Sequence, residues 1–222
     1  MLTLFNNPLG ILIIYGGFLL AITVHEFAHA YISDRLGDPT ARVLGRLTLN
    51  PIPHIDLIGT LLLPLFMFLS GSPIFFGWAK PVPYDPYNLR NPRRDSAVIS
   101  LAGPAANIIL AIMLSVFLHI IPFSVNSVFM QIGEIFVLLI RLNVVLAIFN
   151  LIPIHPLDGF AVVRGILPEE YARQWADLEP YGFVFLLFLV FPIFGSISPV
   201  SRIITPIINL ILSILLPSAR II

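Results

Sequence analysis

The stretch "AITVHEFAHAYISDRLG", residues 21–37, places three ionisable side chains at the end of an apolar run that begins near Leu9. They are His25, Glu26 and His29. The apolar run over residues 10–33 is long enough for a helix to cross a bilayer, which takes about 20 residues. Ionisable groups in such a helix cost free energy and by default mark functional sites. This stretch therefore indicates a membrane protein and shows where its chemistry is expected.

The composition of the whole chain agrees with a membrane protein. Of its 222 residues, 58% are hydrophobic and 11% are charged, whereas soluble domains have about 25% charged residues. The mean hydropathy is +0.96. The formal net charge is zero, so bulk charge gives no reason to expect nucleic-acid binding. There is no cysteine, which excludes disulfides, thiol catalysis and cysteine-based zinc sites.

Long apolar segments predict an all-α polytopic membrane protein that forms a single domain over residues 1–222. Five segments are expected to cross the membrane, and a sixth is in question because it is interrupted by proline and glycine. The five lie at 10–33, 97–120, 134–155, 181–195 and 199–217, and the sixth lies at 57–76.

The distribution of basic residues favours five crossings over six. Seven of the twelve Lys and Arg residues lie between Arg35 and Arg94. The positive-inside rule therefore places the loops at 34–56, 77–95 and 160–180 in the cytoplasm. Segment 57–76 would then enter and leave on one face, and its uninterrupted apolar part of about 13 residues is short for a crossing helix.

We therefore predict that 57–76 is re-entrant, which is tolerated where the backbone is buried in protein or lines a wet cavity. Five crossings put the N-terminus outside and the C-terminus inside. In the alternative of six crossings, 57–76 spans the membrane and some basic loops lie on the outer side.

Two stretches on the expected cytoplasmic side look like strands. "ARVLGRLTL", residues 41–49, alternates loosely, and "WAKPVPY", residues 78–84, is similarly extended in character. We predict a short membrane-associated β-hairpin or sheet near the site. Such a hairpin could cover the site, or its edge could pair with an unwound substrate by strand addition.

The sequence "HEFAH" matches the H-E-x-x-H pattern of zinc proteases. On a helix, positions i and i+4 share a face, so His25 and His29 can reach one metal ion. Glu26 lies beside that ion, where it can take a proton from the attacking water and return it to the leaving amine. The alternative is two histidines that pack between helices and a glutamate bonded to nearby backbone.

A catalytic zinc site needs a third protein ligand. A histidine six residues after His29 would supply it in one protease pattern, but that residue is Arg35, and no Glu lies between Glu26 and Glu134. Asp158 ends the 134–155 span, and with five crossings it reaches the same depth as the histidines. We predict one zinc ion per chain on His25, His29 and Asp158, with a simple turn role as the alternative for Asp158.

HEFAH in an early membrane helix, followed by N-x-x-P-x-x-x-L-D-G at residues 150–159, resembles the site-2 protease family of intramembrane zinc metalloproteases. "AGPAAN" at 102–107 and "GWAKPVP" at 77–83 also resemble that family. The resemblance covers about residues 10–165, the expected catalytic core, and leaves helices at about 181–217. It implies that the two histidines and Asp158 bind zinc and that Glu26 activates water. No segment is long enough for the PDZ or CBS domains of some members, which indicates a short form.

The expected function is a zinc-dependent endopeptidase that cleaves in or near transmembrane segments, as in regulated intramembrane proteolysis. The active site would lie near the cytoplasmic face of the cell membrane. The expected partners are transmembrane substrates and lipid, with no nucleic acid, and the oligomeric state is open. The alternatives are a membrane zinc-binding protein or metal-ion transporter, and an inactive protease homologue.

Two alternative roles are possible for each of several further polar residues. Asn107 and Asn150 could hydrogen-bond the substrate backbone or the oxyanion, or simply join helices. His54 and Asp56 could form a second metal site or gate, although a cap for the segment at 57 is the more usual role. His155 could support the zinc ligands or lie at a surface.

Overall fold

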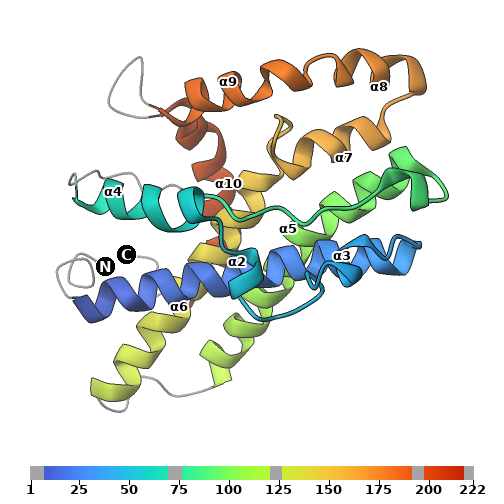
Figure 1. Ribbon diagram of the computed structural model, residues 1–222. Helices are drawn as coiled ribbons and strands as arrows, with labels where there is room; N and C mark the ends of the chain where they lie inside the picture. The colour runs from blue at the N-terminus through green and yellow to red at the C-terminus, as the bar shows by residue number, and fades with distance from the viewer. Residues whose placement is uncertain (1–7, 70–76, 121–126, 192–197, 218–222) are drawn as a thin grey trace.

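The computed structural model describes residues 8–69, 77–120, 127–191 and 198–217, and every regular element within these ranges is a helix (Figure 1). Three helices are long: α2 (Pro8–Leu36), α5 (Pro92–Ile120) and α6 (Ser127–Asn150). The all-α prediction is confirmed. The shorter elements are α3 (Thr40–Val43), η1 (Ile52–His54), η2 (Leu57–Leu62), α4 (Leu63–Leu69), η3 (Pro86–Asn88), α7 (Asp158–Ile166), α8 (Glu169–Ala176), α9 (Glu179–Val190) and α10 (Pro199–Leu215).

Three of the described helices are long and apolar enough to cross a membrane: Gly10–Leu36, Pro92–Ile120 and Met130–Asn150. At 1.5 Å per residue each reaches the roughly 30 Å of a bilayer core. The predicted spans at 181–195 and 199–217 correspond to α9 and α10, which have only 12 and 17 residues. The structure therefore supports an all-α membrane protein, while the number of crossings stays a prediction.

The questioned segment 57–76 begins with two consecutive short helices, the π-helical η2 and then α4. Asp56 caps them, because its Oδ1 accepts hydrogen bonds from the amides of Ile58 and Gly59 at 3.0 and 2.7 Å. Residues 57–69 amount to about 20 Å of helix, which is short of a full crossing. Residues 70–76 lie outside the described residues, so the re-entrant path stays a prediction.

The predicted β-hairpin is wrong, because no described residue forms a strand. Residues 41–43 of the 41–49 stretch belong to helix α3. This helix ends in a Schellman cap, in which the amide of Gly45 donates to the carbonyl of Arg42 and the amide of Arg46 donates to the carbonyl of Ala41. Gly45 adopts φ +69°, a left-handed conformation that suits glycine. In the second stretch, Pro81 and Pro83 carry no N–H for a strand ladder, and residues 77–85 form an extended segment without a sheet.

Helix α5 lies at the centre of the bundle and packs against α2, α6 and α7 (Figure 1). On its other side the core continues through α6 to α9 and α10. Helix α10 turns Val200, Ile204, Ile208 and Leu212 inward at intervals of four residues, as expected for one face of a helix. Its opposite face exposes large apolar side chains, which is suitable for contact with lipid chains.

The carboxylate of Asp38 ties three segments together just after α2 ends. It is fully buried and accepts hydrogen bonds from Ser33 Oγ (3.0 Å), Thr40 Oγ1 (2.5 Å) and the amide of Asp85 (2.9 Å), with further ones from Asn88 Nδ2 and the amide of Thr40. Burial raises the pKa of Asp38, but these donors outweigh it and lower the pKa from 3.8 to about 2. The folded structure therefore favours the charged form of the Asp38 carboxylate.

We expect Asp38→Asn to lower the free energy of unfolding by on the order of 2 kcal/mol at pH 7. The NH₂ group of the asparagine would face hydrogen-bond donors, and it cannot accept hydrogen bonds from them. The folded pKa of Asp38 lies below the unfolded value, so its contribution is complete above about pH 4 and is lost as the pH falls towards about 2. Thermal unfolding in detergent over this pH range measures both effects. The exposed Asp177→Asn variant serves as control, and an unchanged pH slope in Asp38→Asn would contradict the assignment.

Candidate active site

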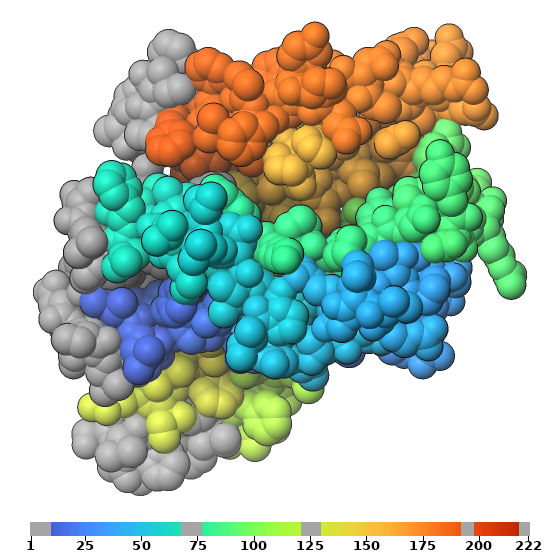
Figure 2. Space-filling model, in the orientation of Figure 1, coloured from blue at the N-terminus to red at the C-terminus, as the bar shows by residue number. Residues whose placement is uncertain are grey.

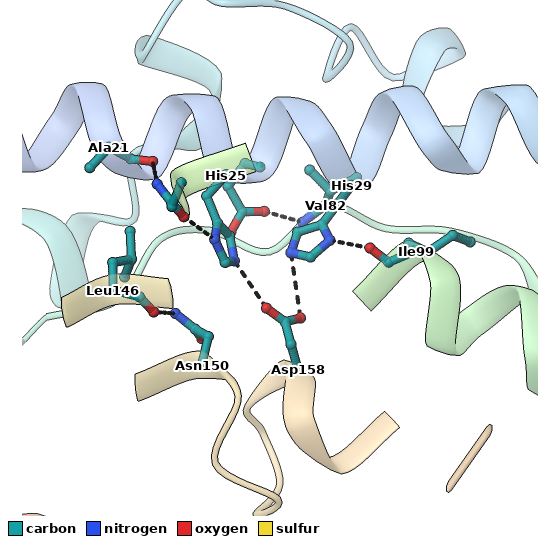
Figure 3. Close-up of polar contacts among 10 residues, drawn as sticks. Ala21, His25, His29, Val82, Ile99, Leu146, Asn150 and Asp158 are labelled. Carbon is teal, nitrogen blue, oxygen red and sulfur yellow. Dashed lines mark hydrogen bonds and ion pairs between the residues drawn. The ribbon is translucent and has the colours of Figure 1, made fainter. Parts of the chain in front are cut away.

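The structure brings together the three residues that were predicted to bind zinc (Figure 3). His25 and His29 lie on one face of α2, with ring centroids 4.6 Å apart, and Asp158 is the first residue of α7. The Nε2 atom of His25 lies 3.0 Å from Asp158 Oδ2, and the Nε2 atom of His29 lies 3.4 Å from Asp158 Oδ1. One ligand atom from each residue lies within 4.8 Å of the others.

The outer ring nitrogens show that this group suits a cation. His25 Nδ1 lies 2.7 Å from Asn107 Oδ1, and His29 Nδ1 lies 2.7 Å from the carbonyl of Ile99. Both partners are acceptors, so each Nδ1 carries the proton and each Nε2 of a neutral ring presents a lone pair. Two lone pairs and a carboxylate then converge, which is the arrangement of a zinc site with oriented histidines.

The chain between α6 and α7 is built to deliver Asp158 to this point. Pro153 and Pro156 interrupt any continuation of α6, and α7 starts within eight residues of the end of α6. Gly159 is required for this turn, because a Cβ there would lie 2.3 Å from the carbonyl oxygen of Leu151 and 2.5 Å from that of Ile152. The L-D-G sequence therefore has a steric reason for its glycine.

Gly103 of α5 faces the two histidines and was not predicted as a site residue. A Cβ at this position would lie 2.5 Å from His29 Nε2 and 2.7 Å from His25 Cε1. The absence of a side chain therefore leaves the room in which the imidazoles meet Asp158. A signal was present in the sequence, because Gly103-Pro104 in the middle of an apolar helix is unfavourable for the helix and indicates close approach.

Glu26 lines the same cavity as the three ligands, beside them on α2. Its Oε2 accepts a hydrogen bond from the amide of Val82 at 3.0 Å, so the extended segment 77–85 lies against it. The cavity has a volume of about 690 Å³, and its walls come from α2, the extended segment, α5, α6, α7 and α9. Figure 2 shows the surface hollowed between helices α8–α9 and the extended segment, with residues near α7 deep in the hollow.

Comparison with known proteins identifies the family. The chain is 38% identical over 180 residues to "Putative zinc metalloprotease YwhC" of Bacillus subtilis, and the match covers 79% of this chain and 78% of that protein. The model of peptidase family M50 matches residues 118–190. The chain belongs to family M50, the site-2 protease family. This agrees with the resemblance noted from HEFAH and LDG.

Other zinc metalloproteases are similar to the chain at lower identity. "Putative zinc metalloprotease Rip2" of Mycolicibacterium smegmatis is 32% identical over 81% of this chain and 66% of its own length. "Zinc metalloprotease MJ0392" of Methanocaldococcus jannaschii is 21% identical over 89% of this chain and 47% of its own length. No solved structure matches the chain significantly.

Two buried asparagines support His25 in this M50 protein. Asn107 is fully buried, and besides its contact to His25 its amide group donates to the carbonyl of Ala21 (3.0 Å) and to Asn143 Oδ1 (2.8 Å). Both amide hydrogens of Asn107 therefore have acceptors here. Its role at the oxyanion stays a prediction, and it would require one of these bonds to break. Asn143 was missed, although a polar residue in an apolar helix was the signal that singled out Asn107.

Of the remaining predicted residues, two line the cavity and two do not. Asn150 lines the cavity and donates to the carbonyl of Leu146 at 2.9 Å. His155 lines it as well, and its Nδ1 lies 3.9 Å from Glu179 Oε1 of α9. His54 is buried outside the cavity lining, with Nε2 2.9 Å from the carbonyl of Thr48, and Asp56 has the capping role described above.

Proposed function

We propose that this chain is a zinc-dependent intramembrane endopeptidase that hydrolyses peptide bonds in or near transmembrane segments of other membrane proteins. The observation that carries the proposal is the convergence of His25, His29 and Asp158 beside Glu26 in a cavity among apolar helices. Membership of a zinc metalloprotease family supports the same reading. Because α2 is itself long and apolar enough to span a bilayer, the cavity is expected at membrane depth.

The site residues have two proposed roles in hydrolysis, metal binding and proton transfer. His25, His29 and Asp158 would hold one Zn²⁺, which when bound polarises the scissile carbonyl and acidifies the attacking water. Glu26 does not join the three ligand atoms, so its carboxylate is available to take the proton of that water. It then returns the proton to the nitrogen of the leaving amine, and the peptide C–N bond breaks.

The site is proposed to face the cytoplasm, because the loops next to it contain most of the basic residues. In this topology His25 and His29 lie near the inner end of the first span, and water reaches Glu26 from the cytoplasmic side. Five crossings, a re-entrant segment at 57–76 and contact with membrane lipid belong to the same proposal.

A metal-ion transporter is the second candidate, and the position of Glu26 argues against it. Transport requires polar groups at several depths along a path, whereas among the described residues the candidate metal-binding side chains form one compact set. Transport also gives no reason for a carboxylate directly beside that set. An inactive homologue would keep the fold, but it would have no need for Glu26 together with all three ligands.

We expect Glu26→Gln to reduce cleavage of a model transmembrane peptide by at least about 100-fold, because the amide cannot accept the proton. The zinc content should stay at one ion per chain, because Glu26 is not a ligand. The measurement is peptide turnover together with metal analysis of the purified protein in detergent. Glu170→Gln, an exposed change on α8, is the control. Near-normal turnover by Glu26→Gln would overturn the proposal, and metal flux into vesicles at a normal rate would favour the transporter.

A further inference from the structure

Arg46 is a buried cation that belongs neither to the metal ligands nor to the cavity lining. The residue is only 6% exposed. Its Nη1 donates to the carbonyl of Pro53, and its Nη2 donates to the carbonyls of Lys80 and Pro81 at 2.5 and 3.0 Å. Burying a guanidinium costs free energy unless its N–H groups make hydrogen bonds. The burial of Arg46 against three backbone carbonyls therefore requires an explanation.

The backbone before Arg46 directs it inward. The Schellman cap after α3 reverses the chain at Gly45, and the amide of Arg46 closes this cap on the carbonyl of Ala41. Arg42, one turn earlier on α3, instead pairs with Asp34 at 3.1 Å and has a side chain that is 63% exposed. Two arginines four residues apart thus have opposite environments, one at the surface and one inside.

Two of the three carbonyls that Arg46 binds, those of Lys80 and Pro81, belong to the extended segment 77–85, and the next residue in that segment contacts Glu26. The amide of Val82 follows the carbonyl of Pro81 directly and donates to Glu26 Oε2 at 3.0 Å. The segment is also fixed by the amide of Lys80 on the carbonyl of His54 (3.0 Å) and by the amide of Asp85 on Asp38 (2.9 Å). Arg46 is therefore the side chain that fixes the segment next to its contact with the expected base.

We propose that Arg46 is a positioning residue for Glu26. By binding the carbonyls of Lys80 and Pro81, it holds the Val82 amide against one carboxylate oxygen of Glu26 and so fixes the orientation in which the other oxygen meets the attacking water. The inference rests on the proposed function, in which Glu26 is the base. Arginine suits this role because its planar guanidinium offers several donors in a fixed geometry, whereas lysine offers a single nitrogen.

The charge of Arg46 adds to this arrangement. Burial lowers the pKa of Arg46, and the charge of Glu26 acts in the opposite direction and favours the cation. The charge of Glu26 therefore favours the charged form of the Arg46 guanidinium across the extended segment.

The test compares Arg46→Ala and Arg46→Lys with Arg42→Ala, the matched loss of an exposed arginine. We expect Arg46→Ala to lower kcat about 10- to 100-fold, the range that misplacement of a catalytic group causes. KM should stay within about twofold, with one zinc ion per chain, and Arg46→Lys should recover only part of the rate. Arg42→Ala should keep the wild-type kcat. Millimolar guanidinium added to Arg46→Ala should restore part of the kcat, which a merely structural defect would not allow.

A double-mutant cycle separates this inference from the proposed function. If Arg46 acts through Glu26, then Arg46→Ala should cause little further loss in the Glu26→Gln background. An inactive Glu26→Gln with a wild-type kcat in Arg46→Ala would overturn the inference and leave the proposed function intact. Loss of zinc, or a raised KM alone, would also overturn it. If Arg46→Ala does not fold, the kcat of Arg46→Lys decides: a wild-type value overturns the inference and a reduced value at full zinc content supports it.

Discussion

The Gly103→Ala substitution is expected to weaken zinc binding and to reduce peptide cleavage with it, although alanine is the better helix former. The new Cβ would lie 2.5 Å from His29 Nε2 and 2.7 Å from His25 Cε1, which is closer than any normal contact. The imidazole rings cannot keep their outer hydrogen bonds to Asn107 and Ile99 and also make room. We therefore expect the affinity for zinc to fall by at least about 100-fold, the upper end of what displaced supporting groups cause.

The matched control for Gly103→Ala is Gly16→Ala in α2. A Cβ at Gly16 would meet nothing within 4 Å, so this change gains only the helix propensity of alanine, about 1 kcal/mol. It should bind one zinc ion and cleave at the wild-type rate. The measurements are a zinc titration of the chelator-treated protein and turnover of a transmembrane peptide. Full zinc binding by Gly103→Ala would mean that the rings can shift without losing the site.

The sequence predicted that His25, His29 and Asp158 would converge, because its signals there are local and chemical. The spacing of His25 and His29 determines a shared helix face, and the sequence around Asp158 ends a helix whose direction follows from the predicted five crossings. Gly103 was less visible, since a glycine in an apolar helix has several explanations until the helix that it faces is known. Arg46 could not be distinguished from Arg42, because the Schellman cap that turns one inward depends on where α3 ends.

The wrong hairpin has a related physical cause. A loose alternation of apolar and polar residues favours a strand, but Gly45 suits a helix cap and the prolines at 81 and 83 remove ladder donors. Segment 77–85 nevertheless lies at the site, where individual side chains and amides fix it in place of a sheet. The sequence pattern therefore predicted the location of the 77–85 segment near the site, but the predicted strand pairing was wrong.

Asp158→Asn is expected to remove zinc binding while leaving the metal-free protein as stable as the wild type. Asp158 Oδ2 lies 3.0 Å from His25 Nε2, so two acceptors face each other unless a proton or a cation lies between them. An asparagine can turn its NH₂ group towards that nitrogen and donate to it. The change therefore relieves a conflict without metal, and it removes the negative charge that zinc requires here.

Thermal unfolding with and without zinc separates these two effects. With zinc at about 100 times its Kd, linkage gives a wild type that is stabilised by about 2.7 kcal/mol, and Asp158→Asn should show no such shift. In chelator, its Tm should be no lower than that of the wild type. Glu179→Gln removes another carboxylate that lines the cavity and should keep the zinc-dependent shift. A lower Tm of Asp158→Asn in chelator would show that the carboxylate stabilises the fold itself, and the claim that three acceptors converge there to hold a cation would be wrong.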